Sequence, residues 1–126
     1  MFLVELFADP RSDVSKLARD LALELVAEGA GGDIINAAIE REHMGFLKRL
    51  ISSKLELTMK QVQRVGEFCS SEFANGRLCS LMLVENGYCS DQLSATVLDA
   101  LRSDTLLTIR DRVKECEESP TIPLIR

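Results

Sequence analysis

The sequence predicts an all-α protein in which short antiparallel helical hairpins stack as an α-solenoid-like, right-angled or superhelical array. Three observations carry this prediction. Apolar residues recur at helical spacing along most of the chain. A similar helix ending recurs at residues 25–29, 50–54 and 83–87, and a capping residue (Asp33, Thr58 or Ser90) follows each one. Hydrophobic residues make up 46% of the chain but aromatic residues only 5%, which favours helix-on-helix packing over β-sheets.

The predicted organisation is one domain followed by a tail. The chain has 126 residues, and domains of about 100–150 residues are the commonest size. We expect residues 1–116 to form a single helical domain. Residues 117–126 lose the helical period and contain Pro120 and Pro123, so we expect an extended or disordered C-terminal tail.

The first two predicted helices lie on either side of Asp9–Pro10, a pair that marks a break in the chain. The apolar residues 1–8 are predicted to form a packed first helix. Residues 13–26 are predicted to form a second helix, which the glycine-rich residues 29–32 end. The inward stripe predicted for this second helix consists of Val14, Leu17, Ala18, Leu21, Leu25 and Val26.

The third helical segment is predicted to begin at Asp33, whose side chain can cap it. Its apolar stripe is interrupted by the polar residues 40–43 and by Gly45, and resumes in the same period at Phe46. Because glycine costs only about 1 kcal/mol inside a helix, the pattern is compatible with two short helices or one bent helix.

Thr58 and Gln61 form a capping-box pattern, in which each residue's side chain bonds the other's backbone N–H at the start of a helix. Asn75–Gly76 is predicted to form a turn. A short helix is predicted to follow it, and Gly87 is placed to end that helix in the left-handed conformation.

The last two helices are predicted at residues 91–101 and about 104–114, with Ser90 and Ser103 as their capping residues. Acidic residues in their first turns and basic residues near the end of the second both suit the helix dipole. The residues predicted to face inward are Leu93, Val97, Ala100, Leu101, Leu106, Ile109 and Val113.

Three stretches resemble helical-repeat families. Residues 8–22 resemble the second half of a HEAT or armadillo repeat, in which an Asp-Pro turn precedes a helix with Val, a small residue and Leu at helical spacing. Residues 33–38, with His43, Leu47, Leu50 and Ile51, look like a degenerate ankyrin helix pair. Residues 83–88 with Ser90 and Asp91 resemble a pentatricopeptide junction. The shared implication is a helical-repeat architecture, HEAT/armadillo-like first, with no binding residues carried over from any family.

The charge of the chain bears on its partners. Its formal net charge is −5, from 20 acidic and 15 basic residues without a basic cluster. Nucleic-acid affinity comes mainly from Lys and Arg, so we expect no nucleic-acid partner. We also expect no membrane binding, because anionic lipid repels an acidic surface and no apolar run reaches the length of a membrane span.

The cysteines, Cys69, Cys79, Cys89 and Cys116, lack the Cys-x-x-Cys spacing of zinc sites. We expect reduced, mostly buried thiols in a cytoplasmic protein, with a redox role as a minor alternative. We expect no metal and no cofactor.

No residue pattern marks a catalytic site. The single histidine, His43, sits on a polar turn without a nucleophile marked nearby, and a solvated side chain is the simpler interpretation. The glycine-rich residues 29–32 follow a helix rather than a strand, and Asp33 puts a negative charge where a phosphate would bind. We therefore expect a protein that is not an enzyme.

The predicted function is a noncatalytic helical-repeat domain that acts as a scaffold or adaptor and binds another protein. Self-association is possible. The candidate partner-binding residues are Arg41 and His43 in the polar turn, Tyr88 after the third helix ending, and Pro120 and Pro123 of a Pro-x-x-Pro pattern. The alternative is a compact acidic helical bundle acting as a small chaperone, immunity or inhibitory protein for a basic partner.

Overall fold

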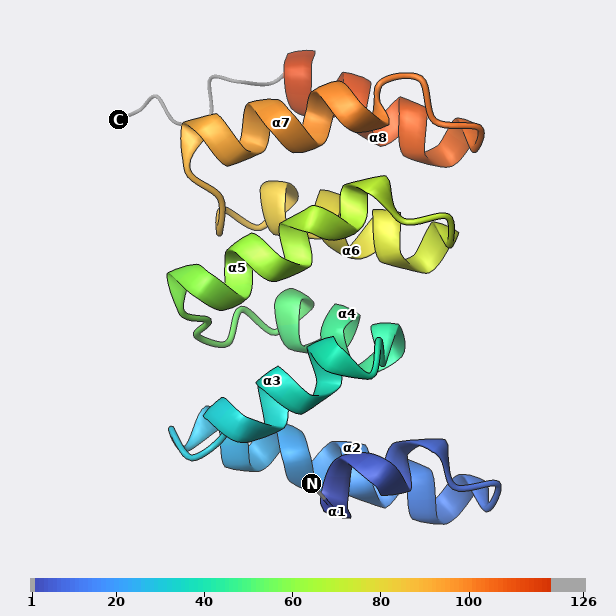
Figure 1. The fold of residues 1–126 in the computed structure, drawn as a ribbon, viewed down its shortest axis with the longest axis vertical. Helices are drawn as coiled ribbons and strands as arrows, with labels where there is room; N and C mark the ends of the chain where they lie inside the picture. Colours follow the sequence, from blue (N-terminus) through green and yellow to red (C-terminus); the bar gives the residue numbers. More distant parts are fainter. Residues whose placement is uncertain (1, 119–126) are drawn as a thin grey trace. The chain divides into compact units, whose positions relative to one another are not determined.

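The structure, a computed structural model, describes residues 2–118 (Figure 1). Every regular element in this range is a helix, so the all-α prediction is confirmed for the described part of the chain. The chain divides into two compact units, Met1–Arg64 and Val65–Arg126. Each unit is described separately below.

The first unit begins with the short α1 (Phe2–Glu5) and a 3₁₀ turn, η1 (Leu6–Ala8). The long helix α2 follows after a short break. In this unit α2 contacts α1, η1 and α3, and α3 packs on α4. The remaining elements are α2 (Ser12–Ala27), α3 (Gly32–Glu40), α4 (Met44–Ser52) and α5 (Met59–Gly66), the last of which crosses the boundary between the units.

Small residues on α2 face the core of the first unit. The buried positions of α2 are Ser15, Ala18, Ala22 and Val26, which recur at helical spacing on one face. The predicted inward stripe was therefore wrong in part, because Leu17 is 69% and Leu21 46% exposed. The rest of this core is aliphatic with two phenylalanines: Val4, Phe7, Ile34, Ile35, Ala38, Ile39, Phe46, Leu47, Leu50 and Ile51.

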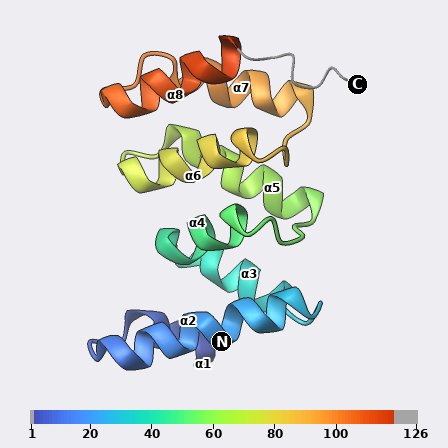
Figure 2. The same cartoon turned by 180° about the vertical axis from the view of Figure 1, so that it is seen from behind.

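The second unit consists of η2 (Glu67–Ser70), α6 (Ala74–Glu85), α7 (Asp91–Leu101) and α8 (Leu107–Glu118). Both ribbon views show α8 returning alongside α7 as a hairpin, and both helices contact α6 (Figures 1 and 2). The buried residues that hold these helices together are Cys69, Leu81, Val97, Leu101, Ile109 and Val113. Contrary to prediction, Ala100 and Leu106 lie outside this core and are exposed.

Four helices end in the same hydrogen-bonded turn. After α2, the N–H of Gly29 donates to the carbonyl of Val26 (3.0 Å) and that of Ala30 to Leu25 (2.9 Å). Such a pair of bonds, one to the carbonyl five residues before the donor and one to the carbonyl three residues before it, is the Schellman motif. The motif needs a residue in the left-handed conformation. The same pair ends α3, α4 and α6. The left-handed residues have φ of 87° at Gly29, 54° at Glu42, 57° at Lys54 and 81° at Gly87.

These turns explain the recurring sequence pattern. The three predicted endings, residues 25–29, 50–54 and 83–87, each carry one of the Schellman turns, and Gly87 has the predicted left-handed conformation. The fourth, at Glu42, separates α3 from α4. Residues 34–51 are therefore two helices rather than one bent helix.

Two predicted helix starts are confirmed. At the start of α5, the Thr58 Oγ1 accepts a hydrogen bond from the Gln61 N–H (3.1 Å), and Gln61 Oε1 accepts one from the Thr58 N–H (2.9 Å). Gln61 also donates to Asn36 on α3, which ties α5 to the first unit. At the start of α7, the Ser90 hydroxyl accepts a bond from the Leu93 N–H (3.2 Å).

Two other predicted caps were wrong. Gly31 rather than Asp33 is the N-cap of α3, and a Cβ on residue 31 would lie only 2.2 Å from Val26 Cγ2, a contact that explains the glycine. Ser103 does not cap α8, which begins only at Leu107. Asp104 instead holds the turn just before the helix by accepting the Leu106 N–H at 2.8 Å.

Two boundaries also differ from prediction. Asn75 and Gly76, predicted to form a turn, lie inside the first turn of α6, and Gly76 is buried there. The last helix continues through Glu118 and so includes the first two residues of the predicted tail. The organisation as one domain remains a prediction.

We expect opposite effects from the same substitution at two glycines of the first unit. Gly29→Ala should lower the free energy of unfolding by about 1 kcal/mol, because alanine is strained at positive φ. Gly45→Ala, within α4, should raise it by up to about 1 kcal/mol, because alanine is the better helix former. An added Cβ meets nothing within 4 Å at either site, so sterics do not distinguish the two. Urea denaturation of both variants provides the measurement, and equal shifts would contradict the assignment of the turn.

Candidate functional site

The turn that carries Arg41 and His43 is held against the N-terminal helix. Arg41 lies 3.5 Å from the Glu5 carboxylate of α1. The His43 ring meets the Phe7 ring edge-on, with 5.2 Å between the centroids. Burial, and then the Arg41 charge, lower the pKa of His43. The structure therefore brings these two predicted partner-binding residues together, but both make contacts within their own unit.

The other predicted partner-binding residues lie elsewhere. Tyr88 is in the α6–α7 turn of the second unit, half-buried, and burial raises the pKa of its phenol. Pro120 and Pro123 lie outside the described residues.

Two of the four cysteines, Cys69 and Cys79, are buried, and the other two are partly buried. Burial raises the pKa of Cys89 to about 11, an effect that the hydrogen bond with Ser94 only partly offsets. Burial also raises the pKa of Cys116. Since the thiolate is the reactive form, Cys89 and Cys116 react slowly near neutral pH.

Residues 2–118 contain neither a cluster of metal-ligating side chains nor a membrane-spanning helix. Within residues 2–118, no three His, Cys, Asp or Glu side chains are grouped so that they could hold a metal ion. Each helix in this range is too short or too polar to traverse a lipid bilayer.

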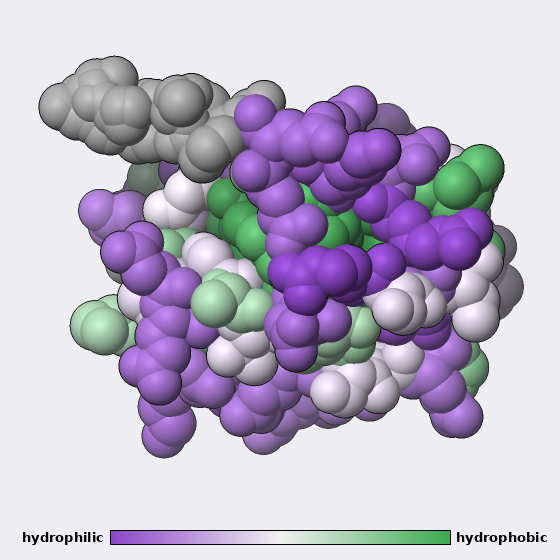
Figure 3. Space-filling view, turned by 90° about the horizontal axis from the view of Figure 1, so that it is seen from above, coloured by the Kyte–Doolittle hydropathy of each residue, from purple (hydrophilic) through white to green (hydrophobic). Residues whose placement is uncertain are grey.

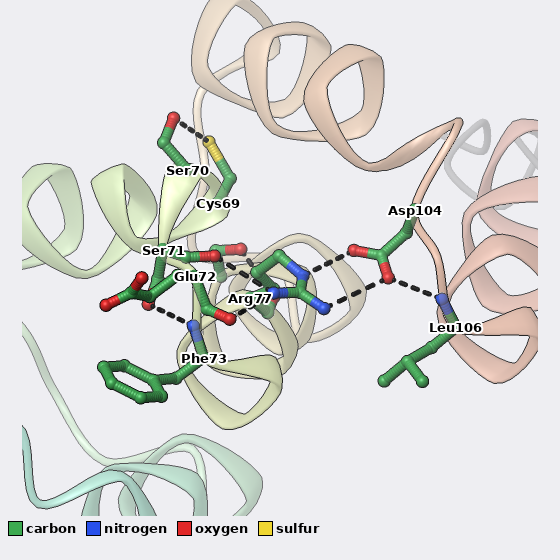
Figure 4. A network of polar contacts seen from close by, with 9 residues as sticks. Cys69, Ser70, Ser71, Glu72, Phe73, Arg77, Asp104 and Leu106 are labelled. Carbon is green, nitrogen blue, oxygen red and sulfur yellow. Dashed lines mark hydrogen bonds and ion pairs between the residues drawn. The ribbon is translucent and has the colours of Figure 1, made fainter.

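The second unit contains a buried ion pair between Arg77 and Asp104 (Figure 4). Arg77 Nε donates to Asp104 Oδ2 at 2.6 Å, and Nη1 donates to the carbonyls of Ser71 and Glu72, each at 3.1 Å. The exposed fractions of the two side chains are 16% for Arg77 and 3% for Asp104. One guanidinium thus joins the start of α6 to the segment before it and to the α7–α8 turn.

The environment of Asp104 favours its charged form. Burial alone would raise the pKa of this carboxyl, but the hydrogen bonds from Arg77 and from the Leu106 N–H outweigh burial, and the net pKa is lowered. We interpret the network as structural, because it links the segment before α6 to the turn that carries Leu106 and Leu107.

Apolar side chains are exposed close to this network. Phe73, the N-cap residue of α6, is 62% exposed, and Leu107, the first residue of α8, is 61% exposed. In Figure 4 the Phe73 and Leu106 side chains lie on opposite sides of Arg77. No local sequence pattern predicts this arrangement, since Arg77 and Asp104 are 27 positions apart.

An open hollow of about 680 Å³ lies along α7 in the second unit. Figure 3 looks onto the α7–α8 hairpin and shows a hydrophobic hollow bordered by hydrophilic side chains. The cavity is lined by Ala95, Thr96, Leu98, Asp99, Arg102 and Glu117, among others. Its charged groups neutralise one another, because Arg102 pairs with both Asp99 and Glu117. The Thr96 hydroxyl in this lining donates to the Gln92 carbonyl of its own helix (3.1 Å).

The outer face of α2 is the second exposed apolar surface, and it belongs to the first unit. Leu17 and Leu21 are one helical turn apart and therefore neighbours on the helix surface. Acidic residues surround them, as described below. The opposite face is buried, and its sequence signal is the small size of Ser15, Ala18 and Ala22. The prediction missed this signal because it placed the larger leucines in the core.

Comparison with known proteins places the chain in no family. No protein-family model, curated protein or solved structure matches it.

We expect Asp104→Asn to lower the free energy of unfolding by about 2–3 kcal/mol, because the substitution leaves the Arg77 charge buried without its counterion. Asp99→Asn is the matched control: this carboxylate pairs with Arg102 but is 78% exposed, and its loss should cost no more than about 0.5 kcal/mol. Chemical denaturation measures both. Equal costs would contradict the structural role of the buried pair.

The pH dependence of the same variant is a separate prediction. Because the folded-state pKa of Asp104 is lowered, its contribution is fully present above the unfolded value of about 4 and is lost as the pH falls through the folded value. Denaturation curves across this acid range should therefore converge for the wild type and Asp104→Asn. A constant gap between them at all pH values would contradict the charge-based explanation.

Proposed function

We propose that this chain is a noncatalytic helical-repeat module, HEAT/armadillo-like, that acts in the cytoplasm as a scaffold or adaptor by binding another protein. The observation that carries the proposal is the exposure of large apolar side chains on helices or just before them. They are Leu17, Leu21, Met59, Phe73, Leu106 and Leu107, with exposed fractions from 41% to 88%. Protein-binding surfaces are built from such side chains, each surrounded by polar ones.

The recurring helix endings support the repeat part of the proposal. Each Schellman turn ends one helix, and at three of the four turns the helices on either side pack on each other: α2 with α3, α3 with α4 and α6 with α7. Stacked hairpins of this kind bury apolar faces only against their neighbours and offer their outer faces to partners.

A specific observation favours the alternative, an acidic bundle that inhibits or chaperones a basic partner. Asp13 and Glu24 lie on the exposed side of α2, next to Leu17 and Leu21. The alternative differs from the leading proposal in architecture, a compact bundle instead of a stacked array, and in role, inhibition or chaperoning of one basic partner.

The test is affinity capture with quantitative mass spectrometry, which compares the intact wild-type chain with three double variants. Leu17→Ser with Leu21→Ser removes the apolar side chains of α2, and Phe73→Ser with Leu107→Ser removes those of the second unit. We expect a protein captured in stoichiometric amount by the wild type to be lost with at least one of these double variants, because apolar anchors dominate interface energies.

Gln92→Ser with Thr96→Ser is the matched control, since both residues are exposed and polar. This variant should keep the partner. Circular dichroism confirms that each variant is folded. Capture of no stoichiometric partner, or of the same set by all versions, would contradict the proposal.

A further inference from the structure

We propose that the outer face of α2 binds a basic amphipathic helix of a partner protein. The face is defined by Leu17 and Leu21 at its centre and by Asp13, Glu24 and Glu28 around them. This inference rests on the proposed protein-binding function and names the surface and the chemistry of the partner.

The apolar part of the face follows from how α2 packs. Ala18 is 4% and Ala22 0% exposed, because α2 presents its small residues to the core. Leu17 and Leu21 consequently point away from the core, with 69% and 46% of their surface exposed. Two leucines one turn apart form a short ridge, and ridges on helices pack into the grooves of other helices.

The charged part of the face is acidic and available. Asp13, Glu24 and Glu28 are exposed and recur at helical spacing from the leucines. In residues 2–118, no hydrogen bond or ion pair occupies their carboxylates.

The nearby basic side chains are only partly neutralised. Lys16 lies 2.7 Å from the Asp20 carboxylate, and Arg49 of α4 lies 3.0 Å from the same carboxylate, so one negative charge serves two positive ones. The single excess positive charge does not balance the three outer carboxylates, and the face keeps a net negative charge.

The leucine pair and the acidic rim together favour one kind of partner. A second copy of the same face would place carboxylate against carboxylate, and nucleic acid or anionic lipid would be repelled. An extended peptide gains affinity from unpaired strand edges, which a helix does not offer. A partner helix with apolar anchors flanked by Lys and Arg matches both the leucine ridge and the acidic rim.

The probe is a synthetic helical peptide of about 15 residues with leucines one turn apart and lysines beside them. A second peptide has the same composition in scrambled order. Fluorescence anisotropy with the full chain measures both. We expect the designed peptide to bind at least about tenfold more tightly than the scrambled one, because only it presents leucines and lysines on one face.

Variants of the chain separate the two parts of the surface. Leu17→Ser with Leu21→Ser should weaken binding about tenfold or more at any salt concentration. Asp13→Asn with Glu24→Gln and Glu28→Gln should weaken it chiefly at low salt and reduce its salt dependence. Leu107→Ser, an equally exposed leucine in the second unit, is the matched control and should leave binding unchanged.

The inference is overturned if the scrambled peptide binds as well, if the Leu17 and Leu21 variant binds like the wild type, or if Leu107→Ser has the same effect. These outcomes are distinct from failure of the proposed function. If a captured partner is lost with Phe73→Ser and Leu107→Ser but retained with the α2 variant, the chain is a protein-binding module that uses a different surface.

Discussion

A left-handed residue after the last helical turn is the constraint on which the arrangement of four of these helices depends. At Gly29, Glu42, Lys54 and Gly87 the backbone turns through positive φ and closes two hydrogen bonds back onto the helix. This turn satisfies carbonyls that would otherwise lack partners and sends the chain back toward the core. The apolar stripes can then meet, because each following helix begins near the end of the one before it.

The packing of α2 shows how the turns and the core set the outer surface. Once the turn at Gly29 directs α3 back onto α2, the face of α2 with the smallest side chains allows the closest approach. Burying Ala18 and Ala22 leaves Leu17 and Leu21 outside. An exposed leucine pair with an acidic rim is thus a consequence of close helix packing, and it is also the feature from which we infer a partner.

The sequence predicted the features that depend on neighbouring residues. The capping box at Thr58 and Gln61, the cap at Ser90 and the left-handed Gly87 all arise within one helical turn. Features set by distant residues escaped prediction. Asp104, rather than Ser103, organises the start of α8 because Arg77 holds its carboxylate. The candidate site on α2 was missed because leucine is usually a buried residue, whereas α2 packs its alanines into the core.

Amide hydrogen exchange at the last donor of each turn tests this account most directly. The N–H groups of Ala30, His43, Leu55 and Tyr88 donate to carbonyls five residues earlier, although each lies outside a helix. If the Schellman turns organise the helices, all four amides should exchange far more slowly than unstructured amides, with protection comparable to that of the helix each one ends. Exchange at the rate of an unfolded chain at these positions, while the helices themselves stay protected, would contradict the account.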